Sequence, residues 1–130
     1  MKFASVQLSD SDVIEIKYNK VEPTREQFET YLDEILDLVK KFPGTGQLYD
    51  GTHIKLLPAE MRIRHGKWIK ENEDLFISNV TVSAFVIPNM LARMVLRGVF
   101  LIQKPVTPYT IVSSREEGLA YIKSNARMAS

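Results

Sequence analysis

The stretch from Ile77 to Ile87 constrains the fold more than any other part of the sequence. Its core is a run of β-branched and other apolar residues, namely Val80, Val82, Ala84 and Phe85 to Ile87. A strand with one exposed face alternates apolar and polar residues, whereas a nearly unbroken apolar run is typical of a strand buried on both faces. The sequence therefore predicts a central strand in a sheet that is covered by helices on both sides.

Two more strands are expected at the start of the chain. Apolar and polar residues alternate from Lys2 to Leu8 and again from Val13 to Tyr18. The Ser9-Asp10-Ser11-Asp12 segment between them consists of turn formers, whose side chains hydrogen-bond the nearby backbone. We therefore predict an antiparallel hairpin at one edge of the sheet.

Helix signals mark about four further segments. Thr24-Arg25-Glu26-Gln27 and Ser114-Arg115-Glu116-Glu117 have the form of capping boxes, and Pro43-Gly44 ends the helix that the first box begins. Helices are also expected from Ala59 to Asn72 and from Pro88-Asn89 to a point before Pro105. In the latter helix, one face is predicted to contain Leu91, Met94, Val95, Gly98 and Ile102.

Short strands at Gln47 to Asp50 and Tyr109 to Val112 complete the expected order of elements. Two strands are followed by helices and strands in alternation, and short β-α-β links imply parallel pairing. The fold class is therefore α/β, with a mostly parallel sheet, an antiparallel N-terminal edge strand and about four flanking helices. At 130 residues, we expect one domain, residues 1–130.

The composition of the chain argues against several classes of functional site. The chain has no cysteine and a formal net charge of +1, so we predict neither a thiolate nor a Cys-based metal site, and no field that would attract nucleic acid. No phosphate-binding loop motif occurs, and neither histidine has the i, i+4 partner of a helical metal site. We expect a cytoplasmic protein without cofactor, metal or catalytic residues, and without stable membrane insertion.

The order of elements and the residues in the second half of the chain resemble the SpoIIAA-like family, the fold of STAS domains, which is grouped with SEC14 domains. The resemblance spans most of the chain. The stretches that carry the resemblance are Leu48-Tyr49-Asp50, Val82 to Pro88, Asn89 to Phe100, and Tyr109 to Ile122. Bacterial STAS domains similar to this fold are switched by phosphorylation of a Ser that follows an Asp at this strand end. Here Asp50 is followed by Gly51, and only Thr52 offers a hydroxyl for such a phosphorylation.

The resemblance implies a non-enzymatic regulatory or protein-interaction module of the STAS type. Its recognition loop would be Asp50, Gly51, Thr52 and His53, because ligands of open α/β sheets bind at the carboxyl ends of the strands. The alternative for this loop is a structural turn, in which Asp50 caps the backbone and Gly51 supplies a positive φ. Hydrolase chemistry would have only Thr52 with His53 as a nucleophile and base.

Basic and apolar residues define two further candidate surfaces. Arg62, Arg64, Arg93 and Arg97 form a candidate basic surface, for which the alternative is a set of solvated helix faces. Phe85, Met90, Met94 and Phe100 form a candidate apolar surface, for which a buried core stripe is the alternative. His65, near Trp68, is interpreted as a packed side chain and not as a general base.

The predicted helix after Pro88 is apolar almost all round, so it must bury a second face. A homodimer through this helix is one expectation. The alternative function is a small carrier that binds an apolar or lipid-like ligand beneath the same helix. The sequence leaves these two hypotheses open.

Overall fold

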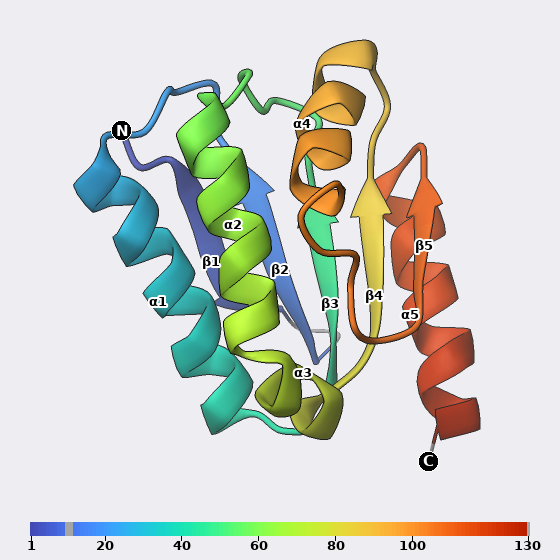
Figure 1. Cartoon of the computed structure of the whole chain (residues 1–130). Helices are drawn as coiled ribbons and strands as arrows, with labels where there is room; N and C mark the ends of the chain where they lie inside the picture. The colour runs from blue at the N-terminus through green and yellow to red at the C-terminus, as the bar shows by residue number, and fades with distance from the viewer. Residues whose placement is uncertain (10–11, 130) are drawn as a thin grey trace.

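The computed structural model describes residues 1–9 and 12–129, with side chains up to residue 125. Within these residues a five-stranded sheet is covered on both faces by helices (Figure 1). The strands are β1 (Ala4–Leu8), β2 (Val13–Tyr18), β3 (Thr45–Asp50), β4 (Val80–Val86) and β5 (Tyr109–Val112). The helices are α1 (Arg25–Lys41), α2 (Ala59–Glu71), α3 (Glu73–Asn79), α4 (Met90–Phe100) and α5 (Arg115–Ala129).

The sheet confirms the predicted topology. Its strands lie side by side in chain order; β1 is antiparallel to β2, and all other pairs are parallel. The register of β3 on β4 places Gln47 opposite Ser83 and Tyr49 opposite Phe85. These four side chains lie on the same face of the sheet, since they alternate with the residues that point to the other face.

The helices divide unequally between the two faces of the sheet. Helices α1 to α4 cover one face, while α5 packs on the other behind β4 and β5 (Figure 1). Strand β4 is buried on both sides: Phe85 belongs to the larger core, and Val82, Ala84 and Val86 pack with Ile122 of α5. The prediction of a doubly buried central strand is therefore confirmed.

The predicted hairpin is formed by β1 and β2. Ser9 N donates to the Val13 carbonyl at 2.8 Å, and Asp12 N donates to the Ser9 carbonyl at 3.0 Å. Asp12 has a φ of 58°, in the left-handed region that Asp tolerates in turns. The remaining two predicted turn formers, Asp10 and Ser11, lie outside the described residues.

Capping residues predicted the starts of α1 and α5 correctly. Thr24 caps α1 reciprocally, because its hydroxyl accepts from Gln27 N and the Gln27 side chain accepts from Thr24 N. At α5 the Ser114 hydroxyl accepts from Glu117 N at 3.2 Å. There, however, the Glu117 carboxylate accepts from the Ser114 hydroxyl, so the second capping box is not reciprocal in the same way.

Two expectations for the central elements are wrong. Ile77 was expected in a strand, but it lies in α3 and is 55% exposed, because the chain resumes a helix after Asn72 before it enters β4. The predicted face of α4 is also wrong apart from Val95. The buried residues of α4 are Ala92, Val95 and Val99.

Candidate functional site

A cavity of about 80 Å³ lies between the sheet and helices α2 and α4. We call it the α2/α4 cavity. Its floor includes Gln47, Tyr49, Ser83 and Phe85 of β3 and β4, and its other walls include His65 and Trp68 of α2 and Val95 and Val99 of α4. Half-buried residues such as Ile69, Leu96, Val106 and Thr107 also line it, so the cavity extends to the surface of the protein.

Aromatic rings form much of the wall. Phe85 stacks on Tyr49 with ring centroids 5.0 Å apart and meets Phe100 edge-on at 5.4 Å. On the opposite side, Trp68 packs edge-on against His65 at 5.2 Å and against Phe76 at 5.1 Å. Apolar and aromatic walls with a few placed polar groups are typical of small-molecule sites.

Three buried polar atoms of the lining have no hydrogen-bond partner within the described part of the chain. They are Gln47 Nε2, His65 Nδ1 and Trp68 Nε1, on side chains that are 3%, 8% and 2% exposed. A buried polar group without a partner costs about 1–3 kcal/mol. A concentration of three such atoms in one cavity is therefore a strong departure from ordinary core packing.

A chain of hydrogen bonds holds His65 in place. The Tyr18 and Tyr31 hydroxyls are hydrogen-bonded to each other, and the Tyr31 hydroxyl lies 2.8 Å from His65 Nε2. Burial raises the pKa of both tyrosines above the usual value of 10 and lowers the pKa of His65 from 6.5 to about 4. All three side chains are therefore uncharged at neutral pH.

These hydrogen bonds also indicate which tautomer of His65 is present. If Tyr18 donates to Tyr31 and Tyr31 donates to His65 Nε2, every hydroxyl hydrogen has an acceptor and the imidazole proton lies on Nδ1. The reverse order leaves the Tyr18 hydroxyl hydrogen without an acceptor that the structure shows, in addition to an unpartnered Nδ1. The first order leaves one buried group, Nδ1–H, without a partner and the reverse order leaves two, so the first is favoured and the proton of His65 lies on Nδ1.

The candidate apolar surface is divided by the structure. Phe85 and Phe100 line the α2/α4 cavity. Met90 and Met94 do not line it; they lie on the outer side of α4 and are 72% and 52% exposed. The four residues therefore belong to two different surfaces.

Sequence reasoning missed Gln47 and Trp68 as site residues, and it identified His65 only as a packed side chain. A signal was present, since Gln47 shares a face of a predicted strand with Tyr49. His65 and Trp68 are likewise three residues apart on the apolar face of a predicted helix. Polar atoms at inward positions of both elements point to a shared interior site.

The loop Asp50 to His53 is a structured turn next to the cavity. Asp50 Oδ1 accepts from the Thr52 backbone N at 3.0 Å and from its hydroxyl at 2.5 Å. Asn89 Nδ2, at the start of α4, donates to the Thr52 carbonyl at 3.1 Å. Thr52 and His53 are exposed, whereas Gly51 is buried and lines the cavity.

Gly51 is needed for a different reason from the one expected. Its φ is not positive, so the expectation of a left-handed turn residue is wrong. A Cβ at this position would lie 3.2 Å from the Val86 carbonyl oxygen and 3.4 Å from Ala92 Cβ. Glycine therefore allows the loop after β3 to pack closely against the end of β4 and the start of α4.

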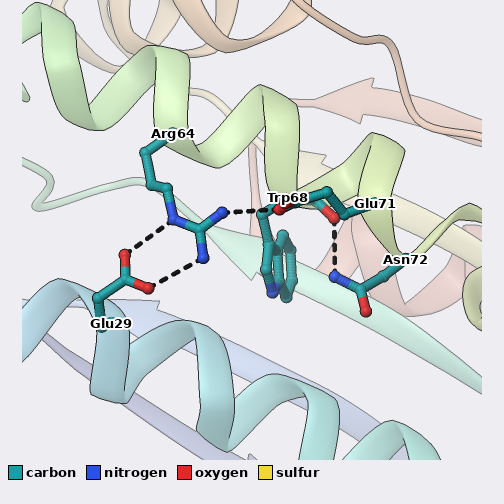
Figure 2. A network of polar contacts seen from close by, with 5 residues as sticks. All are labelled: Glu29, Arg64, Trp68, Glu71 and Asn72. Carbon is teal, nitrogen blue, oxygen red and sulfur yellow. Dashed lines mark hydrogen bonds and ion pairs between the residues drawn. The ribbon is translucent and has the colours of Figure 1, made fainter.

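The candidate basic surface is also divided. Arg64 binds both carboxylate oxygens of Glu29 on α1 at 2.9 Å and also binds Glu71 at 2.7 Å, so it joins α2 to α1 (Figure 2). The hydrogen bonds from Arg64 lower the pKa of Glu29. Arg93 and Arg97, in contrast, are exposed on α4. Arg64 is thus paired within the chain, while Arg62 lies against Gly98 of α4, and a basic surface of Arg62, Arg93 and Arg97 stays a prediction.

Comparisons with known proteins do not decide the identity of this site. Neither family models nor curated proteins match the sequence. The resemblance to the SpoIIAA-like family therefore stays a prediction, and the functional argument depends on the chemistry of the cavity. In the described residues, no helix is long and apolar enough to span a membrane. No three metal-ligating side chains gather there either.

Proposed function

We propose that this protein is a small carrier that binds an apolar small molecule in the α2/α4 cavity. The observation that supports the proposal is the combination of aromatic walls with three buried, unpartnered polar atoms in one cavity. A core that had evolved only for stability would fill this space or pair these atoms. The proposed role is non-enzymatic, as the sequence predicts.

The carrier proposal predicts that protein purified from its host without denaturation retains a small molecule. Organic extraction followed by mass spectrometry should recover it from the wild type but not from Val95→Phe, because the larger ring fills the cavity. Affinity for the recovered compound should fall at least about tenfold in this variant, since its binding volume is occupied.

A matched control for this experiment lies on the same helix. Met94→Phe introduces the same ring on the outer side of α4, away from the cavity. This variant should retain the compound like the wild type. A wild-type protein without any extractable compound would contradict the carrier proposal, and so would equal recovery from all three proteins.

A second proposal is the interaction module, with self-association through α4. The observation that favours it is the exposed apolar surface formed by Met90, Met94 and Leu101, which are 72%, 52% and 86% exposed. Exposed apolar side chains that gather on one element are typical of interaction sites. The two proposals are compatible because these side chains do not line the α2/α4 cavity.

Self-association predicts a mass of two chains in light scattering at micromolar concentration. Met94→Lys should shift the mass to one chain, because a charge at this position would be buried in the interface. Lys123→Met, an exposed change on the opposite face of the sheet, is the control and should leave the mass unchanged. A wild-type mass of one chain would rule out this proposal and leave the carrier proposal intact.

A further inference from the structure

The three unpartnered atoms of the α2/α4 cavity are all hydrogen-bond donors. Trp68 Nε1 carries a hydrogen and can only donate. The Gln47 carbonyl oxygen accepts from the Tyr49 hydroxyl at 3.1 Å, so the amide N–H₂ of Gln47 is the group without a partner. His65 presents Nδ1–H, because its Nε2 accepts from the Tyr31 hydroxyl in the favoured order of the hydrogen-bond chain.

Two observations indicate that these donors bind one uncharged ligand. Gln47 comes from the sheet, while His65 and Trp68 come from α2, so side chains with unpartnered donors line the same cavity from two different elements. Among the described residues, none of those that line the cavity is Lys, Arg, Asp or Glu. A charged group in this space would be desolvated without an opposite charge, which is far more costly than burial of a neutral dipole.

We infer that the ligand is an uncharged apolar molecule that presents a carbonyl-type oxygen to Gln47 Nε2, His65 Nδ1 and Trp68 Nε1. This inference rests on the carrier function proposed above and specifies the class of ligand. A carbonyl oxygen accepts two or more hydrogen bonds and donates none, which suits three donors that have no acceptor. The rest of the ligand contacts the aromatic wall, and it can extend toward the surface past Leu96 and Val106.

The inference is tested with three probes of nearly equal size and shape. Acetophenone has a neutral carbonyl, isopropylbenzene replaces the carbonyl with an apolar group, and benzoate replaces it with a carboxylate. Trp68 is the only tryptophan of the chain, so its indole N–H gives a single resonance in a ¹H–¹⁵N spectrum. Acetophenone should bind and shift this resonance downfield. Its affinity should be at least about tenfold higher than that of benzoate, because the charged probe loses its hydration.

A matched pair of variants tests the donor of Gln47. Gln47→Met has similar length but no N–H, and it should weaken acetophenone binding about tenfold while leaving the affinity for isopropylbenzene within about twofold. Gln7→Met makes the same change at an exposed position on the opposite face of the sheet and should have no effect. If Gln47→Met does not fold, Trp68→Phe also removes one donor, and its affinity can be measured from ligand resonances.

The outcomes separate this inference from the carrier proposal. If isopropylbenzene binds more tightly than acetophenone and the indole resonance does not move, the cavity binds ligands but the carbonyl inference is overturned. Tightest binding of benzoate would overturn the claim that the ligand is uncharged. Failure of all three probes to bind at millimolar concentration would count against both proposals.

Discussion

Replacing Gly66 by Ala is expected to destabilise the protein by about 2 kcal/mol, because one added methyl group overpacks the contact between α2 and α4. A Cβ on Gly66 would lie 2.4 Å from Ile102 Cβ and 3.0 Å from the Val99 carbonyl oxygen. Neither atom can move without a shift of the C-terminal end of α4. The cost of this strain should exceed the gain of about 1 kcal/mol in helix propensity that Ala brings.

Gly98→Ala is the matched control on the facing helix. A Cβ there would meet Arg62 Cδ at 2.5 Å, but this atom belongs to a long, flexible side chain that can rotate away. The variant should therefore be neutral or up to about 1 kcal/mol more stable. Urea unfolding of both variants measures the difference, expected to be about 2–3 kcal/mol. Equal stabilities would show that α2 and α4 do not pack as closely as described.

The free energy of unfolding is expected to fall by about 2 kcal/mol between pH 7 and pH 5, because His65 is buried in its neutral form. Its pKa is about 4 in the folded protein, compared with 6.5 for the unperturbed side chain. The unfolded chain therefore binds a proton as the pH falls through 6.5, while the folded protein does not bind it until the pH approaches 4. The contribution of His65 to the free energy of unfolding is therefore retained above pH 6.5 and declines as the pH falls toward 4.

His65→Met removes this titration and should reduce the change between pH 7 and pH 5 to less than about 0.5 kcal/mol. His53→Asn, which replaces the exposed histidine, should retain the wild-type dependence. Between pH 7 and pH 5, Glu15 and Glu29 should add little to the change in the free energy of unfolding. Hydrogen bonds from Arg115 and Arg64 lower the pKa of these carboxyls, so their contribution is lost only below about 4.5. Urea unfolding at several pH values makes the measurement, and an unchanged slope in His65→Met would contradict the assignment.

The location of the candidate site could be predicted only in part from the sequence. The hypothesis of a ligand beneath α4 named Phe85 and Phe100, which do line the cavity, and also Met90 and Met94, which do not. Periodicity failed here for a physical reason. When a helix is apolar almost all round, its sequence does not show which face the tertiary structure buries.

The donors of the cavity are a second example of this limit. Each is an ordinary residue in its own segment, and only the packing of α2 against the sheet brings Gln47, His65 and Trp68 to one space. Whether a buried polar atom has a partner depends on elements far apart in the chain. Tyr31, for example, satisfies His65 Nε2 from α1, 34 residues away, and leaves Nδ1 for the cavity.

The sequence by itself determined the α/β class, the capped start of α1, the antiparallel β1–β2 edge and the doubly buried strand β4. These features follow from short-range signals, namely capping residues, turn formers and apolar periodicity, which act within a few residues of the chain. Only the tertiary structure decided that α3 precedes β4, that α4 buries Ala92, Val95 and Val99, and that three donors share one cavity. Each of these features depends on contacts between surfaces that are distant in sequence. Local preferences favour several arrangements equally, and close packing selects one of them.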